Sequence, residues 1–320
     1  MQRIKTASGI RSSHVDGYGW TPIDSRRANR SGEFTDSSPA VHVPRRSGYD
    51  VAMTAAEIAR LVVDLRAEHE VVVELLTPLP EVVWDVVTPS QPWTVRDQIV
   101  HLAFFDGVAR WAIDDPAGFE RYRDSLGDRQ QYIDSVSDLG SGKSAGELLH
   151  WWNSEVNGLA DAALRAEPTM RVPWYDSTMS LASMITARLM ETWAHGQDVV
   201  DALHLQRVAT SRLKHITRLG VHALAYSFTV HELLVPDEPI FVAVTAPDTT
   251  EIWRWGDSTA ANVVRGPALD FCLVVTQRRH VADTSLLVQG ETAKVWMGVA
   301  QAFAGPPGFG RARGMFPEGS

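Results

Sequence analysis

The segment ETWAHGQD, residues 191–198, lies inside the run LASMITARLMETWAHGQDVVDAL, residues 181–203, which has the apolar spacing of a buried helix. At about 100° per residue, Glu191, His195 and Asp198 fall within roughly 60° of one another on one face of that helix. The earlier turns of the same face are apolar. Burying a carboxylate or an imidazolium without a partner costs on the order of several kcal/mol. The segment therefore predicts that something in the core compensates these groups.

Three further segments show the same helical spacing of apolar residues. Thr54 followed by Glu57 has the pattern of a capping box at the start of one helix, and Thr94 precedes the next. The four predicted helices span residues 54–77, 94–113, 144–165 and 181–203. Amphipathic helices in this order predict a mainly α fold, with a four-helix bundle over residues 53–205.

The sequence changes character after the bundle. Residues 206–235 continue the helical pattern and predict a connecting helix, whereas residues 236–305 alternate short β-rich runs with two apolar helical runs, as in a small α/β domain. Residues 1–52 are rich in Ser, Gly, Arg and Pro without periodicity, which indicates a disordered leader or sequence upstream of the natural start. Residues 306–320 have the composition of a flexible tail.

The composition argues against several classes of protein. The 320 residues carry a net charge of −9, which disfavours nucleic acid as a partner because such binding usually needs a basic face. Cys272 is the one cysteine, so an internal disulfide framework and a multi-cysteine metal site are excluded, and its apolar surroundings predict a buried, inert thiol. No apolar run approaches the roughly 20 residues that cross a bilayer, and the first residues lack a secretion signal. We therefore expect a cytoplasmic protein without a membrane partner.

Glu191 and His195 have the i, i+4 spacing by which one helix presents two ligands to a metal ion. His101, near the middle of the second predicted helix and surrounded by apolar residues, is the best candidate for a third ligand. Two imidazoles and a carboxylate would leave a coordination position open, as in catalytic sites. Nitrogen and oxygen ligands without a thiolate fit Zn²⁺, Fe²⁺, Mn²⁺ or Ni²⁺, so the spacing alone does not choose the metal. Asp198, and with less support the helix-capping Asp97, could orient a metal-bound histidine.

A buried polar network without metal is the alternative interpretation. Arg188 lies three residues before Glu191 and could pair with it on the helix. His69 also lies on an inward face, where a core histidine is the simpler interpretation. Arg278 and Arg279 follow an apolar helix; they fit either a solvated helix end or a clamp for the carboxylate of a substrate.

Two segments, QPWTVRDQIVHL and ARLMETWAHGQDVVDAL, resemble the metal-site segments of the mycothiol-dependent maleylpyruvate isomerase N-terminal domain, which belongs to the DinB-like four-helix bundles. In that family the first segment brings one histidine, and the second brings a glutamate and another histidine. The matching residues here are Trp93, Thr94, Asp97 and His101, then Glu191, His195, Gly196 and Asp198. The resemblance implies that His101, Glu191 and His195 bind a divalent ion, most simply Zn²⁺.

The resemblance extends to the C-terminal part of the chain. RGPALDFCLVVTQRRH and QGETAKVWMGVAQAFAGPPG are similar to the small α/β domain of a wyosine-base-formation-like subgroup. In the isomerase an arginine of the C-terminal domain assists the thiol or the substrate, and Arg278 and Arg279 are the nearest matches. The section between the second and fourth helices is longer here than in the isomerase.

The resemblance favours an enzyme that uses mycothiol or a similar small thiol as cosubstrate. The expected reaction is isomerisation of, or thiol transfer to, a small unsaturated or electrophilic organic substrate. The sequence identifies no catalytic residue and leaves the substrate and the oligomeric state open. A non-catalytic metal-binding scaffold, or a ligand-binding module, is the alternative.

Overall fold

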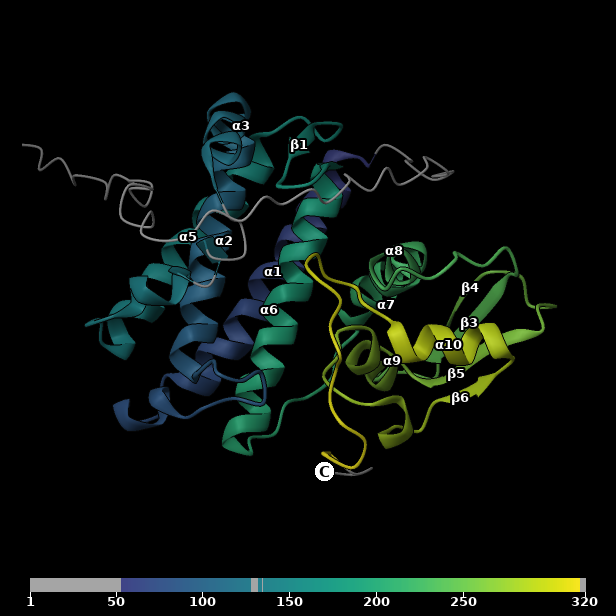
Figure 1. Ribbon diagram of the computed structural model, residues 1–320. Helices are drawn as coiled ribbons and strands as arrows, with labels where there is room; N and C mark the ends of the chain where they lie inside the picture. Colours follow the sequence, from purple (N-terminus) through teal and green to yellow (C-terminus); the bar gives the residue numbers. More distant parts are fainter. Residues whose placement is uncertain (1–52, 128–131, 134, 317–320) are drawn as a thin grey trace, which may run out of the picture. The chain divides into compact units, whose positions relative to one another are not determined.

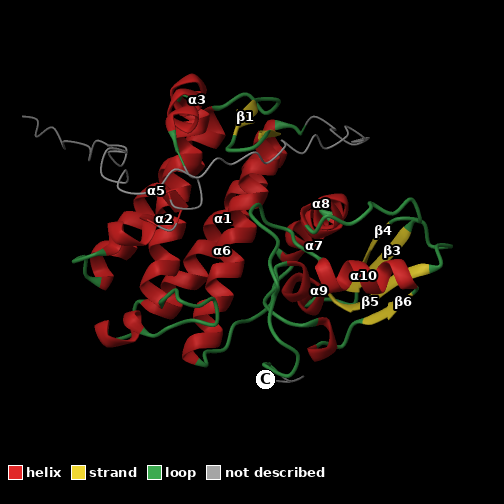
Figure 2. Cartoon of the chain, viewed as in Figure 1, coloured by secondary structure: helices red, strands yellow, loops and turns green. Residues whose placement is uncertain are grey.

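The computed structural model of the chain describes residues 53–127, 132–133 and 135–316 (Figure 1). The predicted leader, residues 1–52, lies outside this part of the chain, as do the last residues, 317–320. Figure 2 shows that long helices dominate the N-terminal half of the described chain, and that most of the strands belong to the C-terminal part.

Four long helices form the N-terminal half, and the prediction of a mainly α fold with a helical bundle is confirmed. They are α1 (Ala55–Leu76), α2 (Val95–Asp114), α5 (Ala145–Arg165) and α6 (Leu181–Leu203), and each packs against two of the others. Capping boxes begin three of them because a hydroxyl at the N-cap and a carboxylate three residues later satisfy each other's backbone N–H groups. These pairs are Thr54–Glu57, Thr94–Asp97 and Ser144–Glu147.

Helices α2 and α6 run antiparallel, which decides where the site lies. Gln98 contacts His195, and Asp106, two turns further along α2, contacts Arg188, two turns earlier along α6. The first half of α2 therefore faces the second half of α6. This places His101 level with His195, although the two residues are far apart in sequence.

The connections between the four long helices contain shorter elements that the sequence pattern did not predict individually. They are η2 (Glu81–Asp85), before α2, then α3 (Pro116–Ser125), η3 (Val136–Gly140), β1 (Arg171–Pro173) and β2 (Thr178–Ser180). The two strands form an antiparallel hairpin before the last bundle helix. Trp174 and Tyr175 follow β1, and both rings contact Phe105 of α2 at centroid distances of 6.5 and 6.2 Å.

The predicted connecting helix over residues 206–235 is replaced by two short helices, α7 (Leu213–His222) and α8 (Leu224–Val230). Helix α6 ends at Leu203, and the backbone of the next residue, His204, is left-handed at φ 50°. The chain after it is not helical, because Arg207 reaches back to donate to the carbonyl of Trp193 and to pair with the buried Glu68. These bonds hold the segment between α6 and α7 against the bundle.

The C-terminal part forms one four-stranded sheet with two helices against it, as predicted. The strands are β3 (Ile240–Thr245), β4 (Ile252–Trp255), β5 (Asn262–Pro267) and β6 (Leu287–Gln289), and the helices α9 (Ala268–Val275) and α10 (Glu291–Val299). The strand order is β4-β3-β5-β6, with β3 and β5 parallel and the outer pairs antiparallel. A short 3₁₀ turn, η4 (Val281–Asp283), follows α9.

Cys272 lies on α9 and is fully buried. Burial raises the pKa of its thiol to about 12. The prediction of an inert thiol agrees with this environment, because a thiol must ionise to act as a nucleophile.

Candidate metal centre

His101, Glu191 and His195 come together between α2 and α6. Each offers one ligand atom, and the three atoms lie within 4.8 Å of one another. We call these three residues the ligand cluster. The side chains of Glu191 and His195 keep 22 % and 10 % of their surface exposed, so the cluster is reachable from outside the core.

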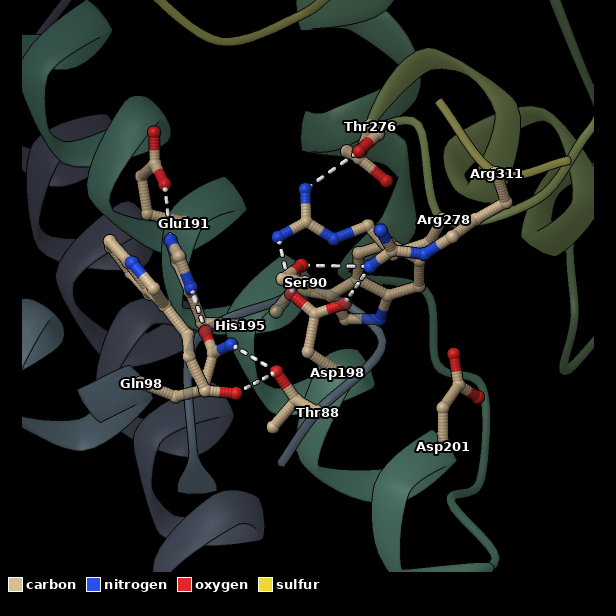
Figure 3. A network of polar contacts seen from close by, with 12 residues as sticks. Thr88, Ser90, Gln98, Glu191, His195, Asp198, Asp201, Thr276, Arg278 and Arg311 are labelled. Atoms are coloured by element: carbon tan, nitrogen blue, oxygen red, sulfur yellow. Dashed lines mark hydrogen bonds and ion pairs between the residues drawn. The ribbon is translucent and has the colours of Figure 1, made fainter. Parts of the chain in front are cut away.

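A chain of hydrogen bonds determines which ring nitrogen of His195 carries the proton (Figure 3). The hydroxyl of Thr88 donates to the carbonyl of Trp93 at 2.8 Å and accepts from Nε2 of Gln98 at 2.8 Å. The amide of Gln98 therefore turns its oxygen toward Nδ1 of His195, which donates to it. Nδ1 holds the proton, and the lone pair of Nε2 is available to a metal ion.

The free nitrogen of His195 faces the carboxylate of Glu191. Nε2 lies 3.1 Å from Oε2 of Glu191. With Nδ1 already protonated, two lone pairs would oppose each other at this distance unless a proton or a metal cation lay between them. Burial acts to raise the pKa of Glu191, but the hydrogen bond and positive charge of a doubly protonated His195, together with the charge of Arg188, outweigh it and lower the pKa to about 2. When His195 is protonated on Nδ1 alone, a bound cation would take the place of the second proton. The carboxylate is therefore ionised and available as an oxygen ligand.

His101 supplies the third donor from a site that excludes a charged imidazole. Burial, followed by the charge of His195, lowers the pKa of His101 well below its usual value. Its ring contacts those of Trp93 and Phe105 at centroid distances of 5.1 and 4.6 Å. Within the described chain, its buried Nδ1 has no hydrogen-bond partner. A neutral imidazole held in this way fits a metal ligand.

The aspartates predicted to support a metal-bound histidine have other partners. Asp97 accepts from the backbone N–H and the hydroxyl of Thr94 at 2.8 and 2.7 Å, so it caps α2. Asp198 is completely buried but turns toward two arginines, which attract its carboxylate more strongly than a neutral imidazole does. The expected hydrogen bond from His195 to Asp198 is thus wrong in the structure, and Gln98 takes that position.

Gln98 could have been found in the sequence. It lies one turn before His101 on a helix face that is otherwise apolar, and an amide in such a place needs a buried partner. The carboxylate of the neighbouring Asp97 was the more conspicuous group, but its helix-capping role already accounts for it.

Arg278 and Arg279 both form ion pairs with aspartates of α6. Nη2 of Arg278 lies 2.7 Å from Oδ2 of Asp198, and its Nη1 donates to the carbonyl of Thr276 at 2.7 Å. Arg279 binds Asp201 with both terminal nitrogens, at 2.6 and 2.8 Å. Neither arginine is a freely solvated helix end.

Arg311 joins the same network from the segment that the sequence presented as a flexible tail. Its Nη2 lies 2.6 Å from Oδ1 of Asp198 and 2.8 Å from the hydroxyl of Ser90 (Figure 3). Burial acts to raise the pKa of Asp198, but the guanidinium groups of Arg278 and Arg311 lower it. No periodic pattern in the tail pointed to this contact.

The predicted alternative partner of Glu191, Arg188, belongs to a different cluster. Nε of Arg188 lies 2.7 Å from Oδ1 of Asp106, and Nε1 of Trp152 donates to Oδ2 of Asp106 at 2.9 Å. We call these three residues the core cluster. Asp106 is completely buried, so its negative charge would be uncompensated if Arg188 paired with another residue instead. The pairing of Arg188 with Glu191 is therefore wrong.

Comparison with known proteins identifies the family. The sequence pattern of the "Mycothiol maleylpyruvate isomerase N-terminal domain" matches residues 65–200. Two proteins of Mycobacterium tuberculosis, from strains CDC 1551 and H37Rv and both named as uncharacterized, are each 42 % identical to the chain over 257 residues. The match covers 80 % of this chain and 100 % of each relative. The chain belongs to the mycothiol maleylpyruvate isomerase family.

Solved structures similar to this family member include crystal structures of the mycothiol-dependent maleylpyruvate isomerase and of one of its histidine-to-alanine mutants. They are 14 % and 13 % identical to the chain, with TM-scores of 0.47 and 0.48. Each match covers 71 % of this chain and 92 % of the solved one. In the described part of the chain, none of the helices is long and apolar enough to span a membrane.

Proposed function

We propose that this protein is a divalent-metal enzyme that uses a small thiol, mycothiol or a similar compound, to isomerise or conjugate a small electrophilic substrate. The observation that supports this proposal best is the ligand cluster, in which a protonated Nδ1 leaves Nε2 of His195 facing the ionised Glu191. Membership of the family supports the thiol. A location in the cytoplasm, where such thiols occur, remains a prediction.

His101, Glu191 and His195 would hold the ion, and the donor set of two nitrogens and one oxygen fits Zn²⁺. When bound, the ion would act as a Lewis acid and keep the sulfur of the thiol deprotonated. Gln98 keeps the ring of His195 in the required orientation and tautomer through its hydrogen bond to Nδ1. Trp93 stacks on the ring of His195 at a centroid distance of 5.7 Å.

Arg278 is the better of the two predicted arginines for binding an anionic group. Arg279 is committed to Asp201 through two hydrogen bonds and also stacks on Phe316 at 3.9 Å. Arg278 uses its terminal nitrogens, but its buried Nε has no partner within the described chain. Its ion pair with Asp198, one turn beyond His195 on α6, brings Arg278 close to the ligand cluster.

The thiol must come from outside the chain. Cys272 is the one cysteine, and it is buried on α9 with its pKa raised to about 12. A protein thiolate is therefore not available to attack a substrate, and an external thiol bound at the ion would supply the nucleophile.

The proposal is tested with Co²⁺-loaded protein and 3-mercaptopropan-1-ol as the probe thiol. We expect saturable growth of a sulfur-to-cobalt charge-transfer band in the near ultraviolet. The variant Glu191→Gln should bind less metal and show no band. Glu155→Gln, which changes a buried carboxylate of α5 outside the ligand cluster, should behave like the unchanged protein.

The outcome separates the enzyme from its alternative. A cobalt spectrum that does not respond to thiol would contradict the thiol-dependent enzyme and favour a metal-binding scaffold. Absence of bound cobalt in the unchanged protein would contradict both.

A further inference from the structure

The segment of residues 305–316, which we call the strap, is tied to the α/β part by hydrogen bonds near both of its ends. Gly308 accepts from Gln277 at 3.2 Å and donates to Gln301 at 2.9 Å. Gly314 donates to Asp283 at 2.7 Å. The side chain between these anchors that reaches the bundle is Arg311.

Arg311 binds one residue of α6 and one residue of the loop that leads into α2. Asp198 lies one turn beyond His195 on α6, and Ser90 lies in the loop that leads into α2. The hydroxyl of Ser90 also donates to Asp198 at 2.9 Å. Arg311 therefore closes a small network that spans the strap, α6 and the loop before α2 (Figure 3).

The same network fixes Arg278, because Asp198 uses its two oxygens for the two arginines. Oδ1 accepts from Arg311, and Oδ2 accepts from Arg278. One carboxylate and two guanidinium groups leave one unit of positive charge in a buried place. A buried charge of this kind is costly unless an anion compensates it. Nε of Arg278 and Nε of Arg311 are both buried and lack partners among the described residues, so donors remain for such an anion.

We propose that Arg311 is a positioning residue: by holding Asp198 from the strap, it orients Arg278 to bind the carboxylate of a ligand at the ligand cluster. The proposal rests on the proposed function, since it assumes a thiol at the ion. The new element is that the strap forms part of the site, and that the strap makes the site prefer ligands that carry a carboxylate. Without Arg311, Asp198 would bind Arg278 with both oxygens. The carboxylate would then fully compensate the charge of the Arg278 guanidinium and change its orientation.

The test compares two thiols of equal length on Co²⁺-loaded protein, 3-mercaptopropionate and the neutral 3-mercaptopropan-1-ol. We expect the unchanged protein to bind the carboxylate more tightly. The variant Arg311→Gln should reduce the affinity for 3-mercaptopropionate on the order of tenfold, the value of one charge-assisted hydrogen bond, and leave the neutral thiol unaffected. Arg311→Lys should restore part of the preference. Arg313→Gln, an exposed position two residues along the strap, is the matched control and should change nothing.

The results distinguish failure of this proposal from failure of the proposed function. If neither thiol binds the unchanged protein, the thiol-dependent function fails. If both bind but Arg311→Gln keeps the preference, or weakens both thiols equally, Arg311 has no positioning role. If the Arg311→Gln variant does not bind metal, the variant Ser90→Ala tests the proposal in its place. That variant removes one of the two partners of Arg311 and must lower the same preference, and an unchanged preference would overturn the proposal.

Discussion

Helix α6 contributes to two buried polar clusters that compensate their charges in different ways. In the core cluster, Arg188 and Asp106 neutralise each other at 2.7 Å, with side chains 4 % and 0 % exposed. In the ligand cluster, the ionised Glu191 lies beside two imidazoles and forms no ion pair with an arginine or lysine among the described residues, although the charge of the nearby Arg188 also lowers its pKa. The charges of the core cluster compensate each other within the chain, although Nη2 of Arg188 has no hydrogen-bond partner among the described residues. Under the proposed function the ligand cluster would take a cation from outside the chain, and the predictions below test this difference.

The first prediction is that breaking the core cluster has the largest effect on stability. Arg188→Met should lower the free energy of unfolding by about 3–5 kcal/mol, because it leaves the charge of Asp106 buried and unpaired. The double variant Asp106→Leu/Arg188→Met should recover most of the loss. Urea unfolding measures the free energy of unfolding of both variants. The matched control is Arg66→Met, which removes an exposed ion pair with Asp161 and should cost less than about 1 kcal/mol.

The opposite result would remove the basis of the comparison. If Arg188→Met unfolds no more readily than Arg66→Met, the core cluster is not an ion pair that stabilises the bundle.

The second prediction concerns acid. Burial lowers the pKa of His69, which packs on Trp152, to about 4. An unfolded histidine titrates near about 6.5, so between these values the unfolded chain binds a proton that the folded chain does not. The free energy of unfolding should therefore fall as the pH falls from about 6.5 to about 4, by at most about 3 kcal/mol, with no such loss above about 6.5.

The variant His69→Gln checks this dependence. Its unfolding free energy, measured in urea between pH about 5 and about 7, should fall less steeply with acid than that of the unchanged protein. Equal slopes would show that His69 is protonated as readily in the folded chain as in the unfolded one.

The third prediction sharpens the description of the ligand cluster. Gln98→Leu should weaken metal binding by about 10- to 100-fold, because Nδ1 of His195 loses the acceptor that fixes its tautomer. Competition with a metal-binding dye gives the affinity. An affinity equal to that of the unchanged protein would mean that the chain from Thr88 through Gln98 does not support the metal.

The fourth and smallest effect is expected at the neighbouring position. Asp97→Ala removes the helix-capping carboxylate and should cost about 1 kcal/mol of stability. Metal affinity should stay within a factor of about two, since its carboxylate bonds Thr94 and no histidine. If Asp97→Ala lost as much metal affinity as Gln98→Leu, Asp97 would have to support the metal site after all.

The comparison also shows how far the sequence predicts the molecule. Apolar periodicity and helix-capping residues predict the four long helices nearly to the residue, since these signals are local. The spacing of Glu191 and His195 is local in the same way, whereas the assignment of His101 to the same cluster relied on its inward position and on the resemblance to the family. The partners of Asp198 could not be predicted, because Arg278 and Arg311 reach it from segments that only the tertiary fold brings near.

The prediction of a connecting helix over residues 206–235 was wrong for a related reason. The apolar spacing of residues 206–235 resembles a helix, but the pairing of Arg207 with Glu68 on α1 outweighs that local preference. Tertiary ion pairs of buried residues leave no periodic trace in a single sequence.

The most direct test of the central claim is the metal content of three purified proteins, measured by elemental analysis after exposure to excess Zn²⁺ and gel filtration. The unchanged protein should retain about one ion per chain, as a single three-ligand site requires. His101→Gln should retain almost none. The matched variant His69→Gln, which replaces another buried bundle histidine of low pKa, should retain about one ion per chain. If His101→Gln keeps its full complement of zinc, the three residues do not share an ion, and the ligand cluster is a buried polar network.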